Sequence, residues 1–250
     1  MILKIDHIAL SSNNFEKDII FFETLGFNVF FKESDVKNLE IKKDLLTQFY
    51  PNHDLCLLTK KGSYNIELLN HRNINSKDGF IYPVFQNIPN KKSWLSEGEI
   101  EELKVKIKIG PGYKFMDKEN KLSNDFLFNE LVVNSINLEQ SINFWKPFGF
   151  ELIEQRETLA KMKFVSILDD NNFFIYLKKA NAIENNLLDD RGFNCIAFVC
   201  KSIDRVIRKI KNEKIIITKQ QDLIINQKNL KICFVKGPQN ELVELVELEY

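Results

Sequence analysis

The chain carries the same sequence pattern twice, and this repeat constrains its fold more than any single residue does. A strand-like run that starts at His7 leads through an amphipathic segment to the Leu-Gly-Phe sequence at residues 25–27. A second run, which starts at Glu130, leads through a similar segment to Phe-Gly-Phe at 148–150, and the two patterns align without a gap. Such a repeat indicates that the chain is assembled from copies of one supersecondary unit.

Each copy predicts a strand, a helix and three more strands, which together form a βαβββ unit. Apolar residues have the spacing of one helical face over 15–22 in the first copy and over 138–145 in the second. The strands expected after these helices cover residues 27–31, 54–59 and 64–70 in the first copy and 150–153, 163–168 and 172–178 in the second.

Two further units complete two pairs. One starts at Phe193, continues through a helix with apolar residues on one face at 203–210, and ends in strands on either side of a turn at Gly237 and Pro238. The other covers residues 79–121 and is shorter and more polar. In it a Gly-Pro turn at 110–111 precedes Asp117, as the turn at 237–238 precedes Glu244.

The composition is that of a soluble globular protein. Hydrophobic residues make up 44% of the chain and charged residues 28%, and 35 basic side chains balance 35 acidic ones. This balance favours neither a nucleic acid nor an anionic membrane as partner. No apolar run approaches the roughly 18 residues that a membrane span requires. The N-terminus has a strand pattern instead of a cleavable signal, so we expect a cytoplasmic protein. We expect it to be a monomer or a homodimer.

The four cysteines lie in apolar strand-like runs, and none belongs to a CxxC pair. Neither a zinc knuckle nor a redox motif is therefore indicated. Because a free cysteine behaves as a small apolar residue, we expect four buried thiols.

These features together resemble the vicinal oxygen chelate superfamily, which includes glyoxalase I, bleomycin-resistance proteins, methylmalonyl-CoA epimerase and extradiol dioxygenases. The motifs that carry the resemblance are His-Ile-Ala-Leu at 7–10, Phe-Phe at 21–22, Leu-Gly-Phe at 25–27, Ile-Glu-Leu at 66–68, and the segment from Gly237 to Leu245. The resemblance implies an α+β protein with two domains, residues 1–122 and 123–250. Each domain would be a half-barrel of two βαβββ units around a cavity.

In the metal-dependent members of this superfamily, the ligands come from the first and last strands of each unit. On that pattern the amino-terminal domain offers His7, Glu67, Tyr82 and Asp117, and the carboxy-terminal domain offers Glu130, Tyr176, Cys195 and Glu244. One imidazole with two carboxylates suits a divalent transition metal such as zinc, nickel, manganese or iron. The resemblance thus implies a metal site at His7, Glu67 and Asp117.

The same resemblance implies roles for the remaining positions. Tyr82, Glu130 and Tyr176 are the expected substrate-binding residues. Glu67 and Glu244 are the expected catalytic carboxylates, and Glu244 is expected to act only in a separate second cavity.

Strand alternation supports three of these residues independently of the resemblance. Side chains two residues apart share a face of a strand, so His7 is expected beside the apolar Ile5 and opposite Asp6. By the same alternation, Glu244 is expected on the face of Leu242, Val246 and Leu248. Glu67 is expected on the face of Asn65 and Leu69, opposite Ile66 and Leu68. A covered carboxylate is costly unless it is paired, protonated or bound to metal.

A structural role stands beside each of these functional ones. A single inward histidine is more often a hydrogen-bonded core residue than a ligand, and glutamates at strand ends are often solvated. The two other histidines, His53 and His71, occupy loop-like or strand-edge positions and are expected at the surface.

The residues present limit the reactions that can be expected. An extradiol dioxygenase uses two histidines and one glutamate, and the second histidine is here replaced by Tyr82 or Cys195. We therefore expect a glyoxalase-like, metal-dependent isomerase or lyase that acts on a small oxygenated metabolite. A metal-free, small-molecule-binding protein, a dioxygenase homologue without the full iron triad, and an interaction scaffold with decayed sites are the alternatives.

Overall fold

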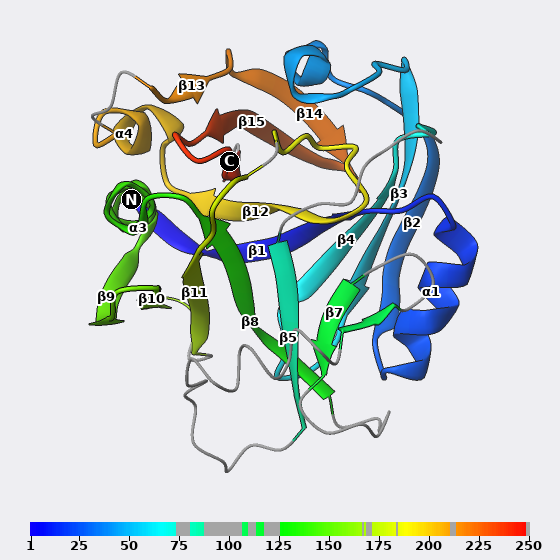
Figure 1. Cartoon of the computed structure of the whole chain (residues 1–250). Coiled ribbons are helices and arrows are strands. Elements are labelled where there is room, and N and C mark those ends of the chain that lie inside the picture. Colours follow the sequence, from blue (N-terminus) through cyan, green and yellow to red (C-terminus); the bar gives the residue numbers. More distant parts are fainter. Residues whose placement is uncertain are drawn as a thin grey trace.

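The computed structural model consists of strands with a few short helices (Figure 1). It describes residues 1–73, 81–87, 107–109, 114–117, 126–166, 168, 172–183, 185–210 and 214–248. At 81–87, 107–109, 114–117 and 126 only the backbone is described. The described helices are too short or too polar to cross a membrane.

The first and fourth units have the predicted order of elements. The first consists of β1 (Ile2–Ser11), α1 (Phe15–Thr24), β2 (Asn28–Lys37), the 3-10 helix η1 (Glu40–Leu45), β3 (Asn52–Thr59) and β4 (Asn65–Asn70). The fourth consists of β12 (Gly192–Cys200), α4 (Ile203–Ile207), β13 (Ile216–Ile217), β14 (Gln221–Ile225), β15 (Lys228–Lys236) and β16 (Leu242–Leu248).

The second and third units form the other part of the chain. The described strands of the second are β5 (Ile81–Asn87), β6 (Ile107–Ile109) and β7 (Lys114–Asp117). The third consists of β8 (Phe126–Ser135), α3 (Leu138–Trp145), the 3-10 helix η2 (Lys146–Phe148), β9 (Phe150–Gln155), β10 (Leu159–Phe164) and β11 (Phe173–Lys179). The strand predicted at 163–168 was placed four residues too late. Two lysines interrupt the apolar residues of 159–164, so the sequence did not predict a strand there, although Lys161 is buried.

The repeat seen in the sequence is a repeat of structure. Gly26 and Gly149, which occupy equivalent places in the first and third units, both have a left-handed backbone, with φ of 82° and 96°. An L-residue with a side chain rarely adopts this conformation. The glycine therefore lets the chain turn from the helix into the next strand in both copies.

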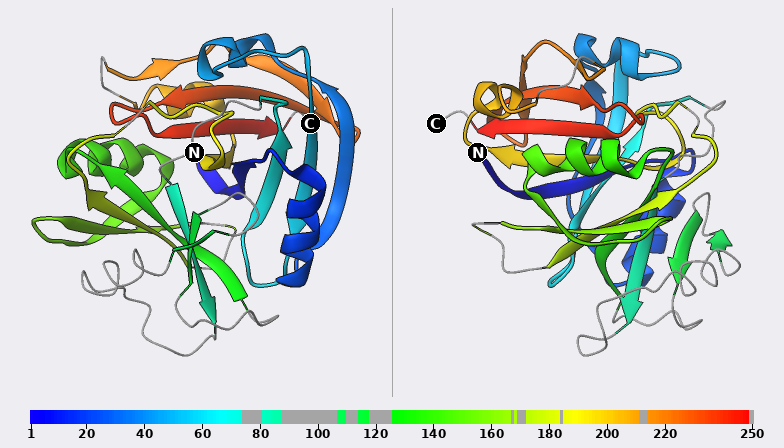
Figure 2. Two further views of the ribbon diagram at one scale, coloured as in Figure 1. Left: turned by 45° about the vertical axis from the view of Figure 1, so that its right-hand side comes forward. Right: turned by 60° about the vertical axis from the view of Figure 1, so that its left-hand side comes forward.

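The units form pairs, as predicted, but the partners are not the consecutive units that the predicted domains contain. The first unit pairs with the fourth, because β1 runs antiparallel to β12 and the strand order is β2-β3-β4-β1-β12-β16-β15-β14. The second pairs with the third through β5 and β8. Both pairings join units from the two sides of the predicted boundary between residues 122 and 123. That residues 1–122 and 123–250 fold as separate domains stays a prediction. β12 and β5 join the two halves through one pair of residues, Phe193 and Ile81. Figure 2 shows the curved strands of the two halves from two further sides.

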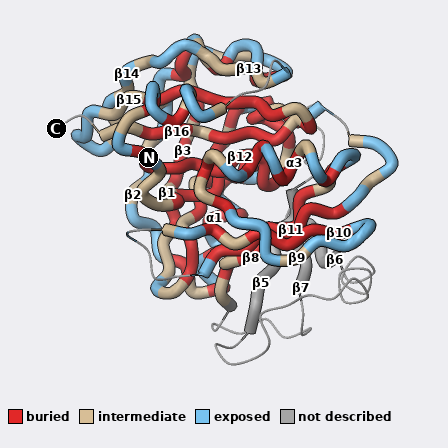
Figure 3. Tube along the Cα trace, turned by 90° about the vertical axis from the view of Figure 1, so that its left-hand side faces the viewer, coloured by how far each residue is buried: buried red, intermediate tan, exposed pale blue. Residues whose placement is uncertain are grey.

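Two apolar clusters lie on opposite faces of the sheet of the first and fourth units. The larger packs α1, α3 and α4 against the strands and includes Ile5, Ile8 and Phe198. The smaller fills the inner face under η1 and includes Ala9 and Phe234. Figure 3 shows that the buried segments run through the central strands. The inner face thus has an apolar floor on which any polar side chain is conspicuous.

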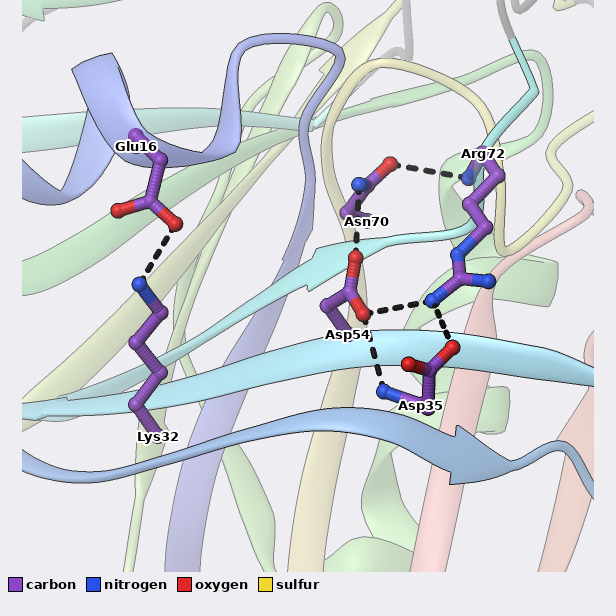
Figure 4. Close-up of polar contacts among 6 residues, drawn as sticks. All are labelled: Glu16, Lys32, Asp35, Asp54, Asn70 and Arg72. Atoms are coloured by element: carbon purple, nitrogen blue, oxygen red, sulfur yellow. Dashed lines mark hydrogen bonds and ion pairs between the residues drawn. The ribbon is translucent and has the colours of Figure 1, made fainter.

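An ion-pair network holds the ends of β2, β3 and β4 together (Figure 4). The Nη2 atom of Arg72 lies 2.6 Å from Asp35 Oδ1 and 2.8 Å from Asp54 Oδ1. Asn70 donates to Asp54 Oδ2 at 3.0 Å, and its own Oδ1 accepts from the backbone N–H of Arg72 at 3.0 Å. The network fixes which residues of β3 and β4 lie side by side.

Candidate metal centre

Three polar side chains from three different strands meet on the inner face of the first and fourth units. His7 comes from β1, Glu67 from the neighbouring parallel strand β4, and Glu244 from β16 on the far side of β12. The strand register brings them together. Ala9 of β1 lies opposite Glu67 of β4. On the other side, His7 lies opposite Ala197 of β12, and Ala197 lies opposite Glu244 of β16. Residues far apart in the sequence therefore converge on one point.

The geometry is that of a site for a cation. His7 Nε2 lies 3.3 Å from Glu67 Oε2 and 3.8 Å from Glu244 Oε2, and one ligand atom from each residue falls within 4.8 Å of the others. Nε2 is buried and makes no hydrogen bond of normal geometry. One imidazole nitrogen and two carboxylate oxygens form a donor set that fits zinc, nickel, manganese or iron.

Asp6 holds His7 in the orientation that a metal requires. Its Oδ2 atom lies 3.2 Å from Nδ1 of His7, on the side of the ring away from the two glutamates. Ligating histidines commonly donate their second N–H to a carboxylate, which fixes the tautomer and leaves the other nitrogen for the metal. The sequence analysis did not include Asp6 among the candidate site residues.

A β-bulge explains why strand alternation failed at this point. The pairing of β1 with β12 is irregular between Ile5 and His7, so two steps along β1 match one step along β12. Ile5 therefore packs in the outer cluster, while Asp6 and His7 both line the inner face. The expectation that His7 shares a face with Ile5, opposite Asp6, was wrong for this reason. Glu67 and Glu244 lie on their predicted faces.

The carboxylates dominate the electrostatics of the site. Burial disfavours a charged imidazole, but the negative charge of Glu67 and contacts with Asp6 and Glu244 outweigh it and raise the pKa of His7 well above its ordinary value. Burial also acts to raise the pKa of Glu67, yet the charge of His7 and the close approach of its Nε2 atom lower that pKa overall. Without a metal, a proton on His7 balances part of the negative charge, and a metal ion would displace that proton.

The three residues lie in a cavity of about 330 Å³ that is open to solvent. Its walls are mostly apolar and include Phe31, Leu57 and Val246. An apolar pocket with a few converging polar groups is the usual form of a small-molecule site.

Comparison with solved structures assigns the fold. The chain superimposes on glyoxalase I from Zea mays with a TM-score of 0.61 at 14% identity, over 98% of this chain and 92% of that one. This is the vicinal oxygen chelate fold. A putative dioxygenase from Bacillus subtilis also matches, with a TM-score of 0.61 at 12% identity, over 100% of this chain and 86% of that one. No family model matches the sequence, and no curated protein is similar to it in sequence.

Within this vicinal oxygen chelate fold, the third residue of the cluster differs from the predicted one. Glu244 was expected in a separate cavity, and this was wrong because pairing of the first and fourth units places it beside His7. Asp117, expected there instead, ends β7, which pairs with β5 and β6 in the other half of the molecule. Its side chain and that of Tyr82 in β5 lie outside the described residues.

The other predicted residues lie in the half formed by the second and third units. Glu130 in β8 is fully buried, and its backbone neighbour on β11 is Phe174. Tyr176 on β11 is also buried, with its ring centre 5.0 Å from the ammonium nitrogen of Lys161. Neither belongs to the His7 cluster, and their role in substrate binding stays a prediction.

The two remaining histidines are not surface residues. His53 and His71 are only 4% and 3% exposed, because η1 and the residues after it cover this end of the inner face. The prediction failed because a 3-10 helix inserted between β2 and β3 leaves little signal in an apolar pattern. All four cysteines are free and buried, as predicted.

Proposed function

We propose that the protein is a glyoxalase-like, metal-dependent isomerase or lyase that acts on a small oxygenated metabolite. The observation that carries this proposal is the cluster of His7, Glu67 and Glu244, with Asp6 behind the imidazole, at the floor of an apolar cavity. The likeness to glyoxalase I supports it at the level of the fold. We also propose a cytoplasmic location and a small-molecule substrate as the partner.

Each residue of the cluster has a definite task in this mechanism. His7 Nε2, Glu67 and Glu244 would hold a divalent metal, which when bound polarises two adjacent oxygens of the substrate. Asp6 keeps Nδ1 of His7 protonated, so that Nε2 presents its lone pair. The apolar walls around Phe31 and Leu57 exclude water and strengthen electrostatic interactions inside the cavity.

A carboxylate of the cluster moves the proton. Glu244 Oε2 is farther from His7 Nε2 than Glu67 Oε2 is, at 3.8 Å against 3.3 Å, so we expect a bound metal to depend less on Glu244 than on Glu67. We assign to it the acceptance of a proton from the carbon next to the substrate carbonyl and its return to the neighbouring carbon. Glu67 serves mainly to hold the metal with His7.

Elemental analysis of the purified protein, after incubation with zinc, nickel, manganese or ferrous iron, tests the metal site. Near-stoichiometric metal is expected in the parent protein and in Glu151→Gln, a control glutamate that is exposed on β9. His7→Gln and Glu67→Gln should lose the metal while keeping the circular dichroism spectrum of the parent. No metal in the folded parent would reject the metalloenzyme and favour the metal-free binding protein.

Proton transfer is tested separately from metal binding. Candidate substrates with oxygens on adjacent carbons are incubated with the metal-loaded protein in D₂O, and loss of the C–H signal is followed by NMR. Glu244→Gln should stop the exchange. Exchange at the parental rate in a metal-loaded Glu244→Gln protein would show that another group is the base.

A further inference from the structure

A second cluster of basic side chains lies at the other end of the same inner face. Lys42 of η1, His53 of β3 and His71 just after β4 are each more than nine-tenths buried, with exposures of 8%, 4% and 3%. The two imidazole rings stack with their centres 5.6 Å apart and an angle of 23° between their planes. The ammonium group of Lys42 lies over the ring of Phe234, which packs in the same inner cluster as Leu55 and Leu69. These two leucines are two residues from His53 and His71 along the chain. Burial and then the charge of Lys42 lower the pKa values of both imidazoles.

Most polar atoms of these buried groups lack partners among the residues that the structure describes. Among these residues the ammonium group of Lys42 has no carboxylate within 4.0 Å and no hydrogen bond, and it lies over the Phe234 ring, with 5.6 Å between Nζ and the ring centre. Nδ1 of His53 and both ring nitrogens of His71 are buried without a hydrogen-bond partner. Glu67 feels the charge of Lys42 but does not contact it. A buried cation that no carboxylate contacts, beside three unused imidazole nitrogens, is costly to maintain.

We propose that Lys42, His53 and His71 form a binding site for the carboxylate group of a small organic anion. The ammonium group donates to one carboxylate oxygen, and an N–H of His71 donates to the other, so that both oxygens are used. His53 also hydrogen-bonds the backbone carbonyl of Val36 and is thereby fixed against the stacked ring of His71. With both imidazoles neutral, the cluster carries one positive charge, which matches a monocarboxylate.

An ion-pair network ties together the strands that carry this site. The neighbours of the two histidines in the sequence, Asp54 and Arg72, are joined by an ion pair of 2.8 Å, as Figure 4 shows. Arg72 also binds Asp35 at 2.6 Å, so β2, β3 and the end of β4 are tied at the level of the two imidazoles. A site on such a frame needs little rearrangement to bind its ligand.

The position of the cluster relates it to the proposed metal site. His71 and Glu67 are four residues apart and face the same side, separated by Leu69 of the inner apolar cluster. Phe234, the ring below Lys42, lies directly opposite Glu244 in the register of β15 and β16. A substrate that binds the metal at one end could place a carboxylate at Lys42. This extension rests on the proposed function, whereas the carboxylate site itself does not.

Nitrogen-15 NMR of the histidine side chains tests the site in metal-free protein with a chelator present. The probes are formate and acetate, titrated against chloride at constant ionic strength. We expect saturable shifts of the imidazole signals of His53 and His71, assigned with His53→Asn and His71→Asn. The overturning result is the absence of a saturable shift up to about 100 mM, where even millimolar affinity saturates a site.

Two neighbouring lysines provide a matched pair of variants. Lys42→Met should weaken formate or acetate binding by about tenfold or more, as expected for loss of a charge-assisted hydrogen bond. Lys43→Met should leave the binding unchanged, because Lys43 is exposed and pairs with Glu40. Equal affinity in Lys42→Met and Lys43→Met would reject the site. If Lys42→Met does not fold, loss of binding in His71→Asn, with Lys43→Met as control, decides in its place. Metal content, measured on the same samples, reports on the metal proposal independently.

Discussion

His53 makes the stability of the protein depend on pH in a way that can be calculated from its burial. Burial, with the charges of Lys42 and Arg72, lowers the pKa of His53 from 6.5 to about 3. Below pH 6.5 the unfolded chain binds a proton at this residue, while the folded protein does not bind it until about pH 3. The free energy of unfolding must therefore fall as the pH falls through this window.

The size of the effect follows from the two pKa values. Between pH 7 and pH 5 the His53 contribution to the free energy of unfolding falls by about 2 kcal/mol. The pKa of His71 is also lowered, by burial and then by Lys42 and His53, so His71 adds to the loss in the same direction. Most carboxylates titrate below pH 5 and contribute little in this window. His7 is present in both the parent and the His53→Gln variant, so its contribution cancels in the comparison.

Urea unfolding of the parent and of His53→Gln at pH 7 and pH 5 measures this contribution. The buffers are amines with chloride and a chelator, so that neither a metal nor a carboxylate occupies the two proposed sites. The loss of stability between the two pH values should be smaller in His53→Gln by about 2 kcal/mol. An equal loss in both proteins would show that His53 is not held neutral in the folded state, and the reasoning from burial would be refuted.

Three further predictions concern the metal site and the packing. Asp6→Asn should weaken metal affinity by about 10- to 100-fold without unfolding the protein, measured by competition with a chelating dye, and unchanged affinity would contradict its role in orienting His7. A metal at about 100 times its dissociation constant should raise the free energy of unfolding by about 2.7 kcal/mol, and Glu67→Gln should abolish this gain in urea titrations. Gly237→Ala should destabilise the protein by about 1–3 kcal/mol, because the added methyl group would contact Glu241 Oε2 and lie 2.8 Å from a ring carbon of Phe144. An unchanged urea midpoint for Gly237→Ala would show that Phe144 moves aside freely.

The sequence predicted the units of the fold but not their partners. The spacing from His7 to Gly26 and from Glu130 to Gly149 reflects local requirements for a strand, a helix and a left-handed turn, and such requirements are written in neighbouring residues. Which unit pairs with which depends on contacts between β1 and β12, almost 190 residues apart. Strand patterns alone do not distinguish consecutive from nested pairing, and Glu244 was misplaced for that reason.

Local irregularities account for the other failures. The bulge before His7 reverses the alternation of β1, and nothing in the run from Ile5 to Ile8 marks where the extra residue falls. His53 and His71 were expected at the surface because the residues that bury them belong to η1, a 3-10 helix of six residues. In both places polar side chains lie on the inner face although the sequence of their own strand did not predict it. These are the positions on which the two proposed sites depend.

The candidate metal centre offers three protein ligands, although two paired units could supply four. The pseudo-symmetry of the first and fourth units shows which ligand is missing. Ala9 lies opposite Glu67 and Ala197 lies opposite Glu244, so the residue that corresponds to His7 in the fourth unit is Cys195. Burial, followed by the charges of Glu244 and Glu67, raises the pKa of the Cys195 thiol well above its ordinary value. A metal binds the thiolate, so a thiol kept protonated by its surroundings is a poor ligand. Only the first unit thus supplies an imidazole. A metal held by His7, Glu67 and Glu244 would keep coordination positions for the oxygens of a substrate, as a catalytic site requires and a structural one does not.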